Sequence, residues 1–309
     1  MKYSIIVGLL GLLMTLESTA QVSNIKDLNT HLNYISSDEL NGRLTGTKGI
    51  DKAATYISKY FKSIGLKPYY ETFRDTFYIK KQTVAYNVIG QIEGNDPLFK
   101  NEPIIIGAHY DHIGNSKAVD GDSIANGAND NASGSVAVMQ LAYALKDSKP
   151  KRPILFVLFD AEEQGLLGST YLAEKLKSED VNPYAIFNIE MVGVSMRDKP
   201  KQAYLTGYDK SNFAKIFNEY ANEEALIFSP QAKDYQLFKR SDNYPFFQSF
   251  EIPAHSVSTF DFTNYNYYHH VDDEAELLDT EHIQSLVNVW AEPLLKIANH
   301  SEKIIKLDN

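Results

Sequence analysis

Cysteine is missing from all 309 positions of this chain. Disulfide bonds therefore contribute nothing to its stability, and a thiol cannot serve as a nucleophile or as a metal ligand. A thiolate zinc finger is excluded. Any metal ion must be held by nitrogen and oxygen atoms, and a mixed set of imidazoles and carboxylates suits zinc first, with cobalt or manganese as alternatives.

Long apolar runs are also missing. The apolar run at 5–13 falls short of the ~20 residues that a membrane-spanning helix needs, and no other segment approaches that length. The run follows Lys2 and leads to small residues that end at Ala20, which is the pattern of a secretory signal peptide. We expect residues 1–20 to be removed and residues 21–309 to form one exported domain, periplasmic or extracellular, without a membrane anchor.

Positive charge is scarce, since 30 Lys and Arg stand against 40 Asp and Glu and leave a net charge of -10. Loss of residues 1–20 removes one cation and one anion, so the net charge of the mature chain is unchanged. This balance argues against nucleic acid as a partner. No internal repeat, low-complexity linker or hinge divides the chain, and its length lies near the upper end for one domain, which supports a single domain.

What the chain does contain is an alternation of apolar strands and helices. From residue 103 onward the expected strands are 104–108, 154–159 and 185–189, and the expected helices are 133–145 and 169–176. Such alternation predicts an α/β fold with a mixed, largely parallel β-sheet sandwiched between helices. The other expected elements are a helix at 49–66, two strands joined by a turn within 69–97, and a closing helix at 280–298.

Two adjacent carboxylates follow one of these strands. The strand at 154–159 runs into Asp160-Ala161-Glu162-Glu163. Neighbouring side chains at a strand end point in different directions, so Glu163 can bind a metal ion while Glu162 stays free to move protons on a water that the metal activates. The pair therefore indicates a metal-dependent hydrolase.

Two more candidate ligands follow the other expected strands. Ligands of a parallel sheet bind beyond the carboxyl ends of its strands, so His109, Glu163 and Glu190 are expected on one rim. Asp111 is close enough in sequence to accept a hydrogen bond from the His109 ring. His112 is an alternative to His109, and a buried ion pair is the alternative interpretation of Glu190.

The remaining candidate ligands lie in turns. Asp130 stands in a polar, glycine-bounded turn before a helix, where a turn with a helix cap is the simpler interpretation. If Asp130 lies opposite His109 and Glu163, the two oxygens of its carboxylate are suited to bridge two metal ions ~3.5–4 Å apart. His269 has carboxylates just downstream to orient its ring, and its neighbour His270 is an alternative that spacing alone does not separate.

Other hydrolytic and nucleotide-binding patterns are missing. The chain has no Gly-x-Ser-x-Gly nucleophile elbow, no glycine-rich phosphate loop that ends in Lys-Ser or Lys-Thr, and no His-Glu-x-x-His helix. A hydrolase with two metal ions is therefore favoured.

Several segments, taken in order, resemble the zinc aminopeptidases of the M28 type and their carboxypeptidase and glutaminyl-cyclase relatives. The resemblance runs nearly the whole length after residue 20 and rests on the segments at 39–49, 107–111, 126–134, 162–169, 241–246, 252–254 and 268–269. It implies the fold of the zinc exopeptidases, which is phosphorylase/hydrolase-like, with a mixed sheet between helices.

The resemblance also implies roles for single residues. One zinc ion would be held by His109 and Glu190, the other by Glu163 and His269, and Asp130 would bridge the two. Glu162 would be the general base that takes a proton from the attacking water and passes it to the leaving amine.

Two positions depart from the family pattern. Most members with two zinc ions carry Asp where this chain has Glu190, which implies a weaker or differently coordinated ion. The usual Ser-Asp-His is here Ser241-Asp242-Asn243, which implies an altered substrate cleft rather than lost catalysis.

The function that this resemblance favours is a secreted zinc aminopeptidase acting on peptides. Carboxypeptidase or dipeptidase action, a glutaminyl cyclase with one zinc ion, and a metal-free binding protein of the same fold are the alternatives. No basic clamp for a substrate carboxylate is identifiable from the sequence. Six aromatic residues near the end of the chain either line an apolar specificity pocket or belong to the core: Phe246, Phe247, Phe260, Tyr265, Tyr267 and Tyr268.

Overall fold

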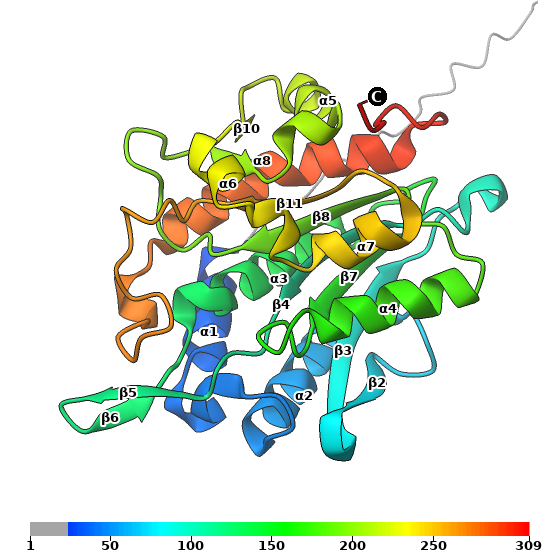
Figure 1. Cartoon of the computed structure of the whole chain (residues 1–309). Helices are drawn as coiled ribbons and strands as arrows, with labels where there is room; N and C mark the ends of the chain where they lie inside the picture. Colours follow the sequence, from blue (N-terminus) through cyan, green and yellow to red (C-terminus); the bar gives the residue numbers. More distant parts are fainter. Residues whose placement is uncertain (1–23, 309) are drawn as a thin grey trace, which may run out of the picture.

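The computed structural model describes residues 24–308, with a nine-stranded sheet at the centre (Figure 1). The strand order is β1-β3-β7-β4-β8-β11-β9-β10, with β2 beside β3. The bounds are β1 Lys67–Pro68, β2 Arg74–Ile79, β3 Thr83–Ile92, β4 Ile104–His109, β7 Ile154–Phe159, β8 Ala185–Glu190, β9 Ala203–Leu205, β10 Leu226–Ile227 and β11 Ala254–Ser258. Strands β7, β4, β8 and β11 are parallel to one another, whereas β3 pairs antiparallel with β7, and β9 with β11. The expected mixed, largely parallel sheet is confirmed.

The central strands are buried on both faces, which is why they read as continuous apolar runs. Successive side chains of a strand point to opposite faces of the sheet. In β4, Ile104 and Ile106 belong to the larger hydrophobic core, and Ile105 belongs to the smaller core on the other face. In β7, Phe156 belongs to the larger core and Val157 to the smaller one. Both faces therefore need a covering layer of helices.

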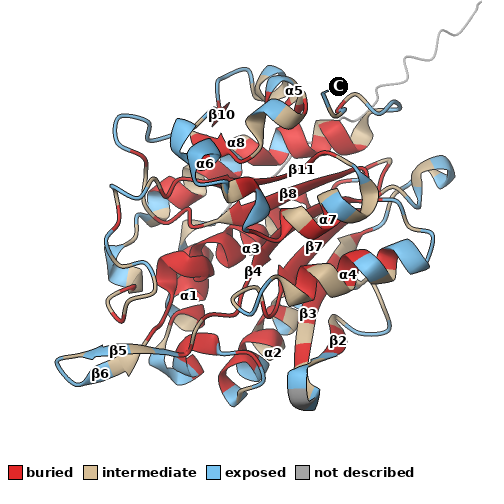
Figure 2. Ribbon diagram, in the orientation of Figure 1, coloured by how far each residue is buried: buried red, intermediate tan, exposed pale blue. Residues whose placement is uncertain are grey.

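Helices supply that cover on each side. The larger core lies against α1 (Ile25–Ile35), α2 (Lys48–Ser63), α3 (Gly134–Leu145), α5 (Phe213–Ala221) and α8 (Thr280–Asn299). The smaller core lies against α4 (Leu167–Ser178) and α7 (Asn243–Phe250), which cross the front of the sheet in Figure 1. Trp290 of α8 is fully buried, with its ring centre 5.3 Å from that of Phe187 in β8. Figure 2 shows this burial through the sheet and on the inner helix faces.

Three short elements stand apart from the layers. A hairpin of β5 (Asn115–Val119) and β6 (Asp122–Ile124) projects from the body with mostly exposed or half-buried residues (Figure 2). The five-residue helix α6 (Pro230–Asp234) follows β10.

The sequence predicts the long elements well and the short ones poorly. The expected strands at 104–108, 154–159 and 185–189 are β4, β7 and β8, and the expected closing helix is α8. The helix expected at 169–176 begins two residues earlier, at Leu167. The hairpin and the elements between 202 and 262 are not predicted individually. Several of them, such as β9 and β10, are strands of two or three residues, which carry too little periodicity to be recognised.

The signal peptide expected at residues 1–20 lies outside the described residues. Within residues 24–308, none of the helices combines the length and the apolar character needed to cross a membrane.

Candidate metal centre

The candidate ligands meet at the carboxyl ends of the parallel strands. His109 ends β4, Glu190 ends β8, and Glu162 and Glu163 stand in the turn after β7. Parallel strands end at the same rim of a sheet, so three separate segments deliver side chains to one place. A cleft of about 170 Å³ is lined there by His109, Glu162, Glu163, Glu190 and Asp130. The rim expected from the sequence is therefore present as a cleft.

The five candidate metal ligands form two groups that share Asp130. In the first group, His109 Nε2 lies 3.4 Å from Asp130 Oδ1 and 3.3 Å from Glu190 Oε2. In the second, His269 Nε2 lies 3.2 Å from Asp130 Oδ2 and 3.1 Å from Glu163 Oε1. One oxygen of Asp130 faces each group, which is the arrangement of a carboxylate that bridges two metal ions.

The two alternative histidines differ in position. His112 is fully buried and its Nδ1 lies 3.0 Å from Glu163 Oε1, so it joins the second group rather than replacing His109 in the first. Single donor atoms of His112, Asp130, Glu163 and His269 all lie within 4.8 Å of one another. His270 instead lies 3.4 Å from Asp272 and makes no ion pair with the central carboxylates among the described residues. The geometry favours His269 over His270.

Backbone hydrogen bonds fix the segments that carry these side chains. The Asp111 carboxylate accepts hydrogen bonds from the backbone N–H groups of Glu162 and Glu163. The His109 ring nitrogen Nδ1 lies 3.2 Å from the backbone oxygen of Asp111 and 3.6 Å from its carboxylate Oδ1. Asp111 therefore orients His109 mainly through its backbone oxygen, and its carboxylate serves the turn after β7, which differs from the expectation.

Two further residues tie the ligand loops together. The Asp273 carboxylate accepts hydrogen bonds from the backbone N–H groups of Asn129 and Asp130 and from the Tyr265 hydroxyl. The guanidinium of Arg43 is fully buried and donates only to backbone oxygens, including those of Tyr110, Asn126 and Gly127. The segment at 39–49 thus braces the loops on both sides of the centre.

Glu190 is held in place by three neighbours. Its Oε1 accepts hydrogen bonds from the Asn188 amide and the Ser241 hydroxyl, and its Oε2 accepts one from the Asn131 amide. Oε2 is also the oxygen that faces His109. The longer side chain therefore reaches the first group while staying fixed.

Asn243 does not line the cleft. Its side chain is fully buried, donates to the backbone oxygens of Phe238 and Ala254, and accepts from the Ser256 hydroxyl. Ser256 does line the cleft. Asn243 can therefore alter the cleft, as expected, only indirectly, through its hydrogen bond with Ser256.

Crowded charges shift the pKa values in opposite directions. Burial alone raises the pKa of Asp130, but the imidazoles of His109 and His269 outweigh it and hold that pKa below its ordinary value. Burial would lower the pKa of His109, yet the neighbouring carboxylates, Glu190 first, raise it well above the ordinary range. The opposite shifts reflect imidazoles and carboxylates that share one buried site.

Glu162 differs from Asp130. Burial, together with the negative charges of Asp242 and Glu190, raises the pKa of Glu162 well above its ordinary value, although His109 opposes this. Burial and then Glu190 also raise the pKa of Asp242 to about 8. A carboxylate with a high proton affinity is suited to general acid–base chemistry.

The donor set fits metal ions. The ring nitrogen Nε2 of His112 is buried and has no hydrogen-bond partner among the described residues. His269 Nε2 lies close to oxygens of Asp130 and Glu163 without the angles of a regular hydrogen bond. Among those residues, no lysine or arginine forms an ion pair with the carboxylates of Asp130, Glu163 or Glu190. Imidazole nitrogens and carboxylate oxygens converge without a permanent cation, as they do where zinc binds.

The sequence reasoning did not identify part of the cleft wall. Tyr204, Leu237, Arg240 and Phe262 line the cleft, and Arg240 is its only lysine or arginine. Strand β9 and the turn at 236–240 are too short for a sequence signal.

Of the six aromatic residues considered from the sequence, Phe260 and Tyr268 line the cleft. Phe246 belongs to the smaller core instead.

Comparison with known proteins gives one family. The sequence pattern described as "Peptidase family M28" matches residues 87–293. A "Probable zinc metalloprotease" of Pyrenophora teres f. teres is 39% identical over 117 residues, which are 37% of this chain and 23% of that protein. "Leucine aminopeptidase 2" of Trichophyton equinum is 28% identical over 183 residues, which are 57% of this chain and 34% of that protein. The chain thus spans less than half the length of these curated relatives.

Solved structures share the fold. A zinc aminopeptidase from Bacillus subtilis has a TM-score of 0.69 and 16% identity, covering 91% of this chain and 98% of that one. A glutaminyl cyclase from Porphyromonas gingivalis has a TM-score of 0.68 and 16% identity, covering 89% and 99%. At this level of identity the likeness shows the fold alone, and the fold is common to both activities.

Proposed function

We propose that this chain, which belongs to peptidase family M28, is a zinc-dependent aminopeptidase that removes residues from the amino ends of peptides. The observation that carries the proposal is the pair of groups that share Asp130, with Glu162 beside them in the same cleft. The names of the curated relatives, a zinc metalloprotease and a leucine aminopeptidase, support zinc and peptide hydrolysis.

The proposed zinc sites use the five candidate ligands. One ion would be held by His109 and Glu190 and the other by Glu163 and His269, with one oxygen of Asp130 on each. Bound zinc supplies a Lewis acid that polarises a carbonyl and lowers the pKa of a water.

Glu162 performs the proton transfers. Burial and nearby carboxylates raise the pKa of Glu162, which makes its ionised carboxylate a stronger base toward the attacking water, whose proton it accepts. It then gives that proton to the nitrogen of the leaving amine. The backbone of Glu162 is fixed through its N–H to the Asp111 carboxylate, which keeps the base at a constant place in the cleft.

Four carboxylates line the cleft, those of Asp130, Glu162, Glu163 and Glu190. Three of them are proposed zinc ligands, so their charge does not decide which end of a peptide is bound. One observation favours a second function: Arg240 lines the same cleft and is suited to bind a terminal carboxylate. Dipeptidase or carboxypeptidase action is therefore the second candidate.

The test is mass spectrometry of a mixed peptide pool after incubation with the zinc-loaded protein. Stepwise shortening from the amino end supports the aminopeptidase. Shortening from the carboxyl end moves the function to a carboxypeptidase, and a pyroglutamate mass shift alone moves it to a glutaminyl cyclase. An unchanged pool, with zinc bound or absent, contradicts peptide hydrolysis and favours a binding protein.

Export is a separate part of the proposal. Residues 1–20 carry the pattern of a signal peptide, so we propose cleavage behind Ala20 and a periplasmic or extracellular location. Sequencing the amino end of the protein from its native cells tests this. A first residue of Gln21 supports export, whereas an intact Met1 contradicts cleavage.

A further inference from the structure

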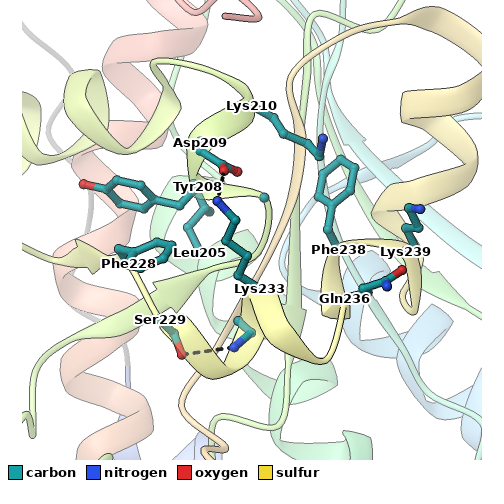
Figure 3. A pocket seen from close by; sticks show the side chains of 12 residues that line it. Leu205, Tyr208, Asp209, Lys210, Phe228, Ser229, Lys233, Gln236, Phe238 and Lys239 are labelled. Carbon is teal, nitrogen blue, oxygen red and sulfur yellow. Dashed lines mark hydrogen bonds and ion pairs between the residues drawn. The ribbon is translucent and has the colours of Figure 1, made fainter.

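A second cavity lies beside the metal centre. It has a volume of about 300 Å³, at the lower end of the range of small-molecule sites. Its lining, drawn in Figure 3, is Leu205, Gly207, Tyr208, Asp209, Lys210, Phe228, Ser229, Ala232, Lys233, Gln236, Phe238 and Lys239. We call it the lysine cavity. None of these residues is a candidate metal ligand.

One wall separates the lysine cavity from the cleft, and it consists of residues 204–207 and 236–240. Along the extended segment side chains alternate, so Tyr204 and Thr206 line the cleft whereas Leu205 and Gly207 line the lysine cavity. We call residues 204–207 and 236–240 the dividing wall. Its two faces belong to two different cavities.

The side chains of the second segment, residues 236–240, are also shared between the cleft and the lysine cavity. Leu237–Lys239 is a 3₁₀ turn, in which side chains three residues apart lie on one face. Leu237 and Arg240 accordingly line the cleft, and Phe238 and Lys239 line the lysine cavity. A ligand that presses on one face of the turn therefore acts on a segment that also shapes the substrate cleft.

The charge of the lysine cavity is positive on a negative protein. Three lysines and one aspartate line it, which leaves two positive charges, whereas the whole chain carries -10. The aspartate is already paired, because Lys233 Nζ lies 2.7 Å from Asp209 Oδ2 (Figure 3). Lys210 and Lys239 form no ion pair within 4 Å among the described residues. Two ammonium groups are thus available for an anion.

Aromatic rings complete the lining. Figure 3 shows Tyr208 and Phe228 on one side of the cavity and Phe238 on the other. The ring centres of Tyr208 and Phe228 are 5.9 Å apart, and Phe228 keeps 43% of its surface exposed. The ammonium group of Lys210 lies 5.1 Å from the centre of the Phe238 ring. A cation beside aromatic rings, of which Phe228 is exposed and Phe238 is buried, matches a ligand that is anionic at one end and apolar at the other.

We propose that the lysine cavity binds the carboxylate of a small organic acid with an apolar body, with Lys210 and Lys239 as its cationic contacts. Two sources share this chemistry: a free acid, such as a released amino acid that acts as an effector, and the carboxyl end of a longer peptide substrate. The binding itself does not depend on the proposed peptidase activity, whereas the choice between the two sources rests on it.

Calorimetry with N-acetyl-phenylalanine tests the binding on the zinc-loaded protein. Because the metal centre can also meet a carboxylate, the decisive quantity is the difference between the unaltered protein and its Lys210→Gln/Lys239→Gln variant. We expect the Kd to rise at least tenfold in this variant, and N-acetyl-phenylalanine amide to bind at least tenfold more weakly than the acid. The control with the same charge change is Lys201→Gln/Lys215→Gln, two exposed lysines outside the cavity.

Equal Kd values for the acid and the amide overturn the proposal, as does an equal response of the two double variants. Phe228→Ser examines the apolar part with little risk to folding, because this residue lies at the surface with 43% of its area exposed. It should weaken N-acetyl-phenylalanine at least threefold and leave acetate unchanged. Equal losses for both probes contradict a role for the ring.

Kinetics distinguish the two sources. If a free acid is the ligand, added N-acetyl-phenylalanine changes the KM for leucine amide in the unaltered protein and not in Lys210→Gln/Lys239→Gln. If a peptide end is the ligand, that variant loses the preference for a pentapeptide acid over its amide. If neither effect is observed, the cavity is not linked to the cleft. Inactivity of the unaltered protein with intact binding overturns the proposed function and leaves the binding site standing.

Discussion

The metal centre and the lysine cavity lie on two faces of one dividing wall but are built in different ways. Three of the five proposed ligands of the metal centre, His109, Glu163 and Glu190, stand at or just after the ends of buried strands. Hydrogen bonds from neighbouring segments hold Glu190 in place. The lysine cavity is lined instead by turns, by strands of two or three residues and by the five-residue helix α6, with lysine side chains and aromatic rings around it. The first is preorganised for fixed chemistry, and the second is suited to adaptable binding.

The largest expected effect comes from the base of the metal centre. Glu162→Gln removes the group that moves the proton while keeping its size, so kcat should fall about a thousandfold with zinc content unchanged. Turnover of leucine amide and metal analysis of the same sample measure both quantities. The matched control is Glu174→Gln, an exposed position on α4. Unchanged turnover of Glu162→Gln would remove this residue from the chemistry.

The next effect concerns the number of ions. The second group is the more compact, since His112, Asp130, Glu163 and His269 bring donor atoms within 4.8 Å, whereas Glu190 stands outside this set. We expect the unaltered protein to bind two zinc ions and Glu190→Gln to bind one, with partial activity. Metal analysis after dialysis against limiting chelator measures this.

Glu302→Gln, an exposed position near the carboxyl end of the chain, is the control for the ion count. A Glu190→Gln protein that still holds two ions would show that Glu190 is not needed as a ligand. A single ion in the unaltered protein would favour the chemistry of a glutaminyl cyclase over the two-ion proposal.

The difference between the two regions also explains what the sequence can predict. His109, Glu163 and Glu190 were recognised because each follows an apolar strand, and the parallel arrangement brings strand ends together. Asp130, in the short helical segment Ala128–Ser133, and His269, in a turn, follow no strand, so the residue pattern offered them as candidates and only the family resemblance gave them definite roles.

Contacts within the site were harder to predict than its location. Asp111 was expected to present its carboxylate to His109, yet that carboxylate accepts backbone N–H groups from the turn after β7. Arg240 and the lysine cavity were missed, because they depend on how short segments fold over one another and leave no periodic pattern.

A buried histidine behind the dividing wall should make stability depend on pH. His255 is fully buried, its Nδ1 lies 2.8 Å from the Thr206 backbone oxygen, and its Nε2 lies 2.7 Å from the Ser211 hydroxyl. Burial lowers its pKa from 6.5 to about 4. Between these values the unfolded chain binds a proton that the folded chain does not, so the free energy of unfolding falls as pH drops from 6.5 toward 4.

The expected loss at this site is about 2 kcal/mol at pH 5 relative to pH 7.5. Urea unfolding of the metal-free protein at both pH values measures it, and the drop should be smaller by that amount in His255→Gln. His300→Gln, beyond the end of α8, should keep the full drop. An identical drop in all three proteins would mean that His255 is protonated as easily in the folded as in the unfolded chain.

The smallest effect is expected from Arg240, the one arginine or lysine that lines the cleft. It stands on the same dividing wall as Lys239 but on the opposite face, so it can meet the carboxylate of a dipeptide bound at the metal centre. Arg240→Gln should lower kcat/KM for Leu-Gly about tenfold and hardly change it for leucyl-glycinamide, because only the first presents a carboxylate. Since an exposed charge pair is screened by salt, the difference should shrink at high ionic strength.

The control is Lys215→Gln, at an exposed lysine of α5, which should leave the ratio of the two kcat/KM values unchanged. Equal losses on both substrates would mean that Arg240 shapes the cleft without recognising a carboxylate, and the wall would then carry its charge selectivity on the lysine side alone.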